Sequence, residues 1–154
     1  MKKRIMLIAS TLVVTAFALT KLHTVTAYAG EGWMSEDGEW SYLDENDEPL
    51  QNTWRQSRDS WFYLGDQGIM LRNCFIEQEN SLYYVFDDGA RAENTWVLVD
   101  EGDEKGHEAG WYYFGANGKE YRGTTSSFKR SVDGGSYIFN ESGRMLTGWI
   151  DDEG

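Results

Sequence analysis

Aromatic side chains at a fixed spacing are the residues of this sequence best suited to recognise another molecule. Four copies of one aromatic tetrapeptide begin at Trp40, Trp61, Leu82 and Trp111, and a degenerate fifth copy begins at Ser136. The first three copies start at equal intervals, at positions 40, 61 and 82. Aromatic rings clustered at a fixed register form pockets that bind ligands. The pattern therefore indicates binding through ring surfaces, with simple packing between repeats as the alternative.

No group of residues in the sequence suggests catalysis. His107 is the single histidine beyond position 29, and nothing in the sequence suggests a rigid partner for it as a general base. Cys74 stands where two sibling repeats carry Thr53 and Thr95, so we interpret it as a small packed residue. The many carboxylates lie mainly in turns, where solvation does not raise the pKa of a general acid. We therefore predict that the chain is not an enzyme, has no catalytic residue and needs no cofactor.

An acidic insertion over residues 97–110 precedes the fourth tetrapeptide. Its carboxylates lack the spacing and the bidentate acid of a calcium-binding loop. We therefore predict a solvated loop and no metal site. The acids in question are Asp100, Glu101, Asp103 and Glu104.

The N-terminal segment, residues 1–29, has the three parts of a secretory signal peptide. Basic residues at positions 2–4 precede an apolar stretch at 5–19, and Ala27 and Ala29 form a small-x-small cleavage site. An uncleaved anchor is the weaker alternative, because the stretch is shorter than the roughly 20 residues of a spanning helix. We therefore predict export, cleavage and no membrane association afterwards, with residues 30–154 as the mature domain.

The predicted mature chain is strongly acidic. The leader holds four of the 14 basic residues and none of the 26 acids, so 10 basic residues remain and the formal charge is −16. Such a surface repels nucleic acid and anionic lipid, whose binding depends on basic groups. It suits a cationic ligand, and it equally suits a solvated surface that binds none.

Turn residues recur in step with the tetrapeptides. A Gly lies seven positions after the start of each of the last four copies, at 68, 89, 118 and 143, and Asp47 takes this place in the first copy. Aromatic runs beside Asn, Asp and Gly clusters predict β-hairpins, here with the tetrapeptide as the first strand. Pro49 in the second strand predicts an edge position, because proline cannot donate to a ladder. Alternation along the strand places Trp40 and Tyr42 on one face and Ser41 on the other.

These repeats predict the fold class. The mature chain has no helical periodicity, and a single two-stranded hairpin is marginal in water, so the units must stack. We therefore predict an all-β fold in which about five tandem β-hairpin repeats stack as a β-solenoid over residues 30–154. The last repeat opens at Trp149 and stops before its tetrapeptide.

Gly-Trp segments at 32–33 and 148–149, together with Gly38-Glu39-Trp40, carry a family resemblance. They resemble the choline-binding, or cell-wall-binding, repeat of surface proteins of Gram-positive bacteria and their phages. Glucan-binding repeats of glucosyltransferases and the carbohydrate-binding repeats of clostridial toxins are similar. The resemblance covers residues 30–154 and implies a solenoid with ligand between consecutive hairpins.

The resemblance also implies the composition of each binding cage. A cage takes the Trp of the Gly-Trp segment, the first ring of the tetrapeptide and the third-position ring of the next copy. The predicted ligand-binding residues are Trp33, Trp40 and Tyr63 in one cage and Trp54, Trp61 and Tyr84 in a second.

Two further cages have defects in the sequence, so we predict two sites. In the third, which would combine Phe75, Leu82 and Tyr113, Leu82 removes an aromatic wall. In the fourth, the insertion places Trp96 and Trp111 twice as far apart in the sequence as Trp33 and Trp40. The third-position residue of the fourth cage would be Ile138.

The function implied by the resemblance is a non-catalytic module that attaches a secreted protein to choline-bearing teichoic acid or a related wall polymer at the cell surface. A quaternary ammonium has no proton to donate, so ring faces recognise it, each contact contributing about 0.5 to 2 kcal/mol. The alternative is a glucan-binding module whose rings stack on sugars. A third hypothesis is the targeting fragment of a wall enzyme or adhesin with a separate catalytic or adhesive domain.

Overall fold

The computed structural model describes residues 32–123 and 129–148, and every regular element in these residues is a β-strand. The strands pair as five antiparallel hairpins, each of them a separate two-stranded sheet. The all-β prediction of tandem hairpins is confirmed, whereas the predicted signal peptide and Trp149 lie outside the described residues. The hairpins are β1 (Gly32–Glu36) with β2 (Glu39–Leu43), β3 (Thr53–Ser57) with β4 (Ser60–Leu64), β5 (Cys74–Gln78) with β6 (Ser81–Val85), β7 (Thr95–Val99) with β8 (Gly110–Phe114), and β9 (Lys129–Val132) with β10 (Gly135–Ile138).

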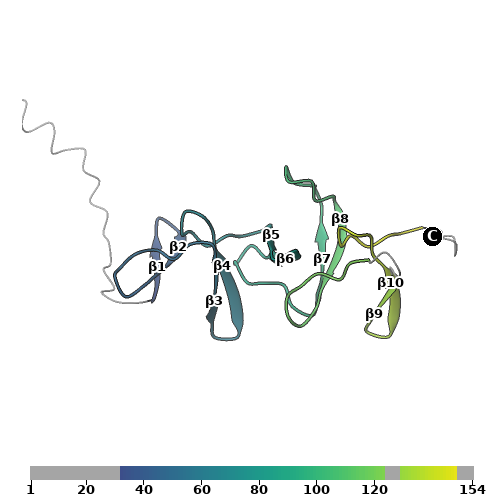
Figure 1. Ribbon diagram of the computed structural model, residues 1–154, viewed down its shortest axis with the longest axis horizontal. Helices are drawn as coiled ribbons and strands as arrows, with labels where there is room; N and C mark the ends of the chain where they lie inside the picture. Colours follow the sequence, from purple (N-terminus) through teal and green to yellow (C-terminus); the bar gives the residue numbers. More distant parts are fainter. Residues whose placement is uncertain (1–31, 124–128, 149–154) are drawn as a thin grey trace, which may run out of the picture.

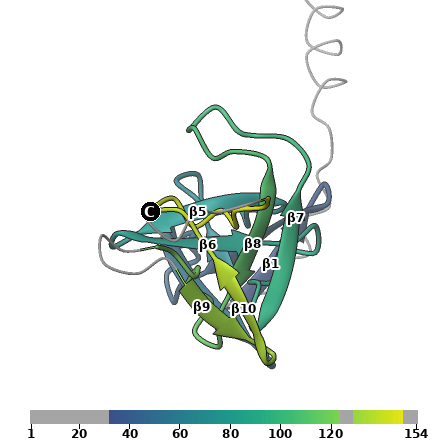
Figure 2. The same cartoon turned by 90° about the vertical axis from the view of Figure 1, so that its right-hand side faces the viewer.

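The hairpins follow one another along the long axis of an elongated molecule (Figure 1). Viewed along that axis, successive hairpins point in different directions around it (Figure 2). This is the arrangement of a solenoid, in which each unit contacts only its neighbours. Among the described residues no helix is long and apolar enough to cross a membrane.

Left-handed backbone closes the short turns within the hairpins. In the turn between β1 and β2, Asp37 and Gly38 have φ of 50° and 87°. Glu79 and Asn80 take the same place between β5 and β6, with φ of 51° and 60°. Positive φ at both central residues defines the type I′ turn, whose twist matches that of the flanking strands. Asp-Gly suits this turn well, while Glu79 carries a side chain in a region that disfavours it.

The turn at Glu79 offers a stabilising substitution. Left-handed backbone disfavours most side chains by roughly 1–2 kcal/mol, whereas Asn and Gly tolerate it. The double replacement Glu79→Asn and Asn80→Gly should therefore raise the free energy of unfolding by about 1 kcal/mol, measured by urea denaturation. Glu45→Asn is the matched control, because Glu45 is an exposed turn residue outside the left-handed region. Equal gains from both changes would contradict this explanation of the turn.

The tetrapeptide is the second strand of its hairpin, which corrects the predicted pairing. Trp54 pairs with Tyr63 across β3 and β4, while Leu64 meets Met70 beyond the next turn in a single bridge. The segment after that turn divides its backbone hydrogen bonds between two hairpins. The Met70 N–H donates to the Trp40 carbonyl of the preceding hairpin at 2.7 Å, and the next N–H donates to the Tyr63 carbonyl at 2.9 Å. The segment therefore links neighbouring units instead of forming a long strand.

Pro49 occupies the first copy of this linking position. It bridges Leu43, as Met70 bridges Leu64 in the next repeat. No hairpin precedes β1 in the described part of the chain, so position 49 has no neighbouring carbonyl that needs an N–H. Proline is tolerated here because it has no N–H to donate, which is also why the sequence predicted an edge position for it.

Apolar burial is divided among the contacts between hairpins. One buried cluster joins β5–β6 to β7–β8 through Phe75, Tyr112 and Phe114. Others join the second hairpin to the third and the fourth to the fifth, the latter through Phe139. Because no single core spans the described residues, each contact between units stabilises the array largely on its own.

Candidate functional site

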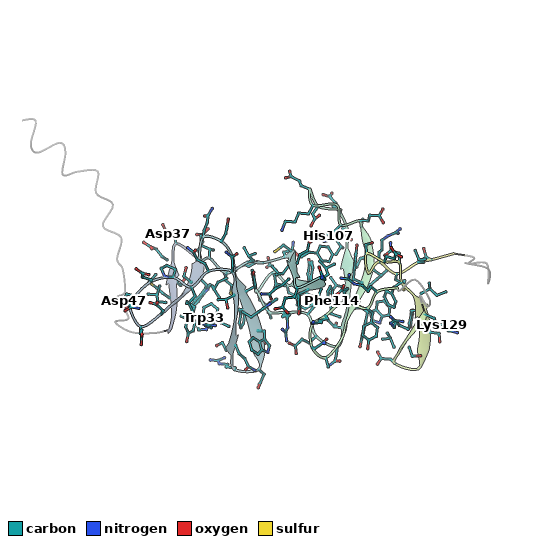
Figure 3. The ribbon with its side chains drawn as sticks, viewed as in Figure 1. Trp33, Asp37, Asp47, His107, Phe114 and Lys129 are labelled. Carbon is teal, nitrogen blue, oxygen red and sulfur yellow. The ribbon has the colours of Figure 1, made fainter. Side chains whose placement is uncertain are left out.

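Five hairpins leave four junctions between neighbours, which we number from the N-terminal end. At the first junction the Trp33 ring lies 6.4 Å from Trp40 of its own hairpin and 5.4 Å from Phe62 of the next, centroid to centroid. Figure 3 labels Trp33 on the side of the first hairpin that faces β3. These three rings, Met70 and Asp88 are among the residues that line an open cavity of about 500 Å³.

The third ring of this cavity is Phe62, whereas Tyr63 was predicted from the sequence. Tyr63 is buried opposite Trp54, with ring centroids 4.9 Å apart. Strand alternation is the reason: neighbouring positions face opposite sides of a hairpin, so the second position of a tetrapeptide faces the preceding unit. The structure thus brings Trp33 and Trp40 together and excludes Tyr63 from the cavity that they line.

The second junction repeats this geometry one unit further along. The Trp54 ring lies 5.3 Å from Tyr83, again a second-position ring. Tyr84, the predicted member, is buried opposite Phe75 at 5.2 Å. A guanidinium occupies this junction, because Arg91 lies over the rings of both Trp54 and Trp61.

At the third junction, side chains of the chain itself pack against the aromatic rings. Phe75 contacts Tyr112 of the next hairpin, with ring centroids 5.0 Å apart. His107 covers the Phe75 ring, with centroids 4.5 Å apart, and its Nδ1 lies within hydrogen-bonding distance of Asp103 Oδ2, at 2.7 Å. Figure 3 shows His107 on the side from which the long loop between β7 and β8 projects. The predicted solvated loop is exposed over most of its length, and His107 is its inward contact.

A buried carboxylate completes the third junction. Glu120 accepts a hydrogen bond from the Leu82 N–H at 2.8 Å and ion-pairs with Arg122. With Leu82 in place of a Trp and a carboxylate beside it, this junction lacks the ring faces of an aromatic cage. The prediction that Leu82 removes a wall agrees with this arrangement.

The fourth junction has the same ring geometry as the first. Trp96 lies 6.4 Å from Trp111, the separation also found between Trp33 and Trp40, and 4.7 Å from Tyr137 of the last hairpin. The insertion does not part the two tryptophans, because its residues beyond Val99 form the hairpin turn. Spacing along the sequence predicted a wide separation of the rings, whereas strand register sets their actual distance.

One further position in each junction was not predicted from the sequence. It lies two residues after the turn Gly, and its N–H donates to the carbonyl of the first tetrapeptide residue in the preceding hairpin, at 2.7 to 3.0 Å. Aligning the turn glycines would have revealed it, because the spacing is constant. Its occupants at junctions one to four are Met70, Arg91, Glu120 and Met145.

Exposure separates the four junctions into two kinds. Trp40 is 40% exposed and Trp111 is 42% exposed, so the first and fourth junctions present open ring faces. The equivalent Leu82 is 4% exposed, and Trp61 lies beneath the Arg91 guanidinium. The open junctions are also the two with methionine at the linking position.

Titration plays no part in these ring surfaces. Burial raises the pKa of Tyr63 and Tyr84, so both phenols stay neutral at physiological pH. Burial also raises the pKa of the Cys74 thiol, which works against a reactive thiolate. Within residues 32–123 and 129–148, no group of three or more His, Cys, Asp or Glu side chains is arranged to hold a metal ion.

Comparison with known proteins points to one repeat family. The sequence pattern of the cell wall binding repeat matches residues 52–70. Choline binding protein F from Streptococcus pneumoniae shares 28% identity over 79% of this chain and 40% of its own, with a TM-score of 0.58. A complex of CbpF with ipratropium has the same fold, with 24% identity over 77% of this chain and 32% of the other and a TM-score of 0.53.

A shorter structure also matches, although its TM-score is lower. The choline binding domain of Spr1274 from Streptococcus pneumoniae shares 27% identity over 62% of this chain and 100% of its own, with a TM-score of 0.47. Among curated proteins no sequence matches. The chain spans 40% of the length of choline binding protein F, so the likeness concerns the repeat region and not that whole protein.

Proposed function

We propose that the chain, which contains a match to the cell wall binding repeat and resembles choline binding protein F, is a non-catalytic module that attaches a secreted protein to choline-bearing teichoic acid or a related wall polymer. The observation that carries this proposal is the pair of junctions at which aromatic rings from two hairpins lie together beside a half-exposed tryptophan, and at the first junction these rings line a cavity. The two ring sets are Trp33, Trp40 and Phe62 at the first junction and Trp96, Trp111 and Tyr137 at the fourth.

Ring faces suit a trimethylammonium head group for an electrostatic reason. The group carries a positive charge but has no N–H to donate, so the negative face of an aromatic ring is its best neutral partner. Three rings at right angles or nearly so, as Trp33 is to Trp40 and to Phe62, surround such a head group on several sides. Asp88, which lines the first cavity, and the acidic composition of the chain attract a cation, while Arg58 in the same lining opposes it.

The proposed site residues differ from those predicted from the repeats. Trp33 and Trp40 remain the proposed ligand contacts at the first junction, with Phe62 in the place expected for Tyr63. Trp54, Trp61 and Tyr84 were expected to form the second site, yet Arg91 covers Trp54 and Trp61 and Tyr84 is buried in its own hairpin. We therefore assign ligand to the first and fourth junctions.

A glucan is the second candidate ligand, and the polar residues in the lining of the first cavity favour it. Ser57, Ser60 and Arg58 line this cavity beside the rings. Sugars bind through ring stacking together with hydrogen bonds, and these side chains would supply the latter. Choline binding requires only aromatic ring faces, and the fourth junction also provides these.

Thermal unfolding with and without ligand separates the two candidates. A ligand that binds only the folded chain stabilises it by about 2.7 kcal/mol at a concentration 100 times its Kd. We expect millimolar choline to raise the Tm of the purified chain and to change its tryptophan fluorescence. A soluble glucan at equal concentration should do neither. A response to glucan without a response to choline would assign the module to carbohydrate binding.

We further propose that residues 1–29 direct export and are removed, so that the module acts at the cell surface. The basic start, the apolar stretch and the Ala27 and Ala29 cleavage site support this. Because the proposed module is non-catalytic, any catalytic or adhesive activity would belong to a separate domain. The intact mass of the secreted protein tests the cleavage, with an expected N-terminus at Gly30.

A further inference from the structure

The second junction already contains a cation. We infer that Arg91 is a built-in occupant of this aromatic cage and excludes choline from it, an inference that rests on the function proposed above. The guanidinium carbon lies 5.2 Å from the Trp54 ring centroid, 5.3 Å from Trp61 and 5.8 Å from Tyr83. A positive charge within about 6 Å of a ring face is attracted by the ring quadrupole. Arg91 therefore makes the contacts that a ligand cation would make.

The position of Arg91 is fixed by more than the rings. Oε1 of Glu93 accepts hydrogen bonds from Arg91 Nε at 2.9 Å and from Arg91 Nη2 at 2.5 Å, and the Arg91 side chain is 12% exposed. Its backbone N–H donates to the Trp61 carbonyl at 2.8 Å. A guanidinium held by a carboxylate through two of its nitrogens is more ordered than a free surface arginine. The side chain is thus part of the junction and not a passing surface contact.

The next turn shows how tightly the guanidinium is enclosed. A Cβ added at Gly118 would lie 2.4 Å from Nε of Arg91, and this glycine has φ of +73°. The equivalent Gly89 meets Met70 in the same way, at 2.6 Å from its terminal methyl carbon. The two turns thus close over whichever side chain occupies the linking position.

The contrast with the open junctions explains what Arg91 does. Met70 and Met145 occupy the same linking position, and a methionine adds apolar surface but no charge. A side chain tethered to the cage competes with free ligand at an effective concentration on the order of millimolar or higher. Choline would have to displace a tethered guanidinium together with its Glu93 ion pair. The sequence change from methionine to arginine thus closes one cage of the array.

Binding stoichiometry tests this inference directly. Isothermal titration of the full chain with choline should give about two sites. The Arg91→Met variant should give about three, and adding Trp61→Ala to this variant should remove the extra site. Arg72→Met is the matched control, because Arg72 is exposed and its hydrogen bond goes to the Gly38 carbonyl. The control should keep two sites. Three sites in the unmodified chain, or two in Arg91→Met with its fold intact by circular dichroism, would overturn the inference.

A second measurement does not depend on choline and covers a variant that fails to fold. In the unmodified chain, ring currents should shift the Hδ resonances of Arg91 upfield of those of the other arginines, and their correlation with the assigned backbone of Arg91 identifies them. If no arginine resonance is displaced, Arg91 does not occupy the cage, whatever the chain binds. A displaced resonance in a chain that ignores choline would support the occupied cage and reject the proposed function.

Discussion

Alanine in place of Trp40 or Trp111 should reduce retention of the protein on choline-bearing walls by about 10²-fold or more. Each replacement removes a half-exposed ring from one open junction and leaves the other junction intact. A wall presents many copies of the same ligand, so two sites on one chain bind with an avidity that exceeds either affinity by about 10² to 10⁴. Losing one site removes this gain, and sedimentation with purified walls measures it.

Free choline should give a different result with the same variants. The remaining site keeps its own affinity, so titration should show one site instead of two with a nearly unchanged Kd. Phe86→Ala is the matched control: Phe86 is 36% exposed and its ring contacts Tyr84 of its own hairpin, 5.8 Å away. If Phe86→Ala lowers wall retention as much as Trp40→Ala, general loss of aromatic surface and not a cage explains the effect.

Much of the fold follows from the sequence because the repeat encodes the same local structure several times. Each copy places an aromatic run beside a turn cluster, and five copies in register leave few other interpretations. The strand partner was harder to predict, because turns lie on both sides of the tetrapeptide. Type I′ geometry at Asp37 and Gly38 decides that the preceding segment is the partner.

The site was less predictable because it forms between units. A repeat pattern identifies which rings recur, but the facing of two hairpins decides which ring enters which junction. Period-two alternation already placed neighbouring positions on opposite faces. Applied across the junction, the same rule would have chosen Phe62 over Tyr63.

The second junction depends on a single substitution that a pattern of rings does not register. Arg91 stands where Met70 and Met145 stand in the outer junctions, and it fills the cage without a change in any aromatic residue. The third junction also carries a charge at this position, Glu120, but there Leu82 replaces a tryptophan as well. The insertion between Trp96 and Trp111, by contrast, is conspicuous in the sequence but has no effect on the ring separation, which is 6.4 Å as it is between Trp33 and Trp40.

Trp96→Ala should lower stability more than alanine at either of the exposed cage tryptophans, Trp40 and Trp111. Its ring contacts Tyr113 of its own hairpin at 5.1 Å and both Tyr137 and Phe139 of the last unit, at 4.7 and 5.9 Å. Removing a large packed ring destabilises a protein by about 3 to 5 kcal/mol. That loss is a large part of the free energy of unfolding of a typical domain, which is only about 5–15 kcal/mol.

The loss should appear first at the C-terminal end of the array, because stability in a solenoid depends on contacts between neighbours. We expect the urea midpoint to fall and amide exchange to speed up in β9 and β10 while β3 and β4 keep their protection. Trp111→Ala removes the other tryptophan of the same junction but a more exposed one, so it should lower stability by much less. Equal destabilisation by both changes would mean that Trp96 contributes to this junction as ligand-facing surface, as Trp111 does, and not as the ring that joins the last two hairpins.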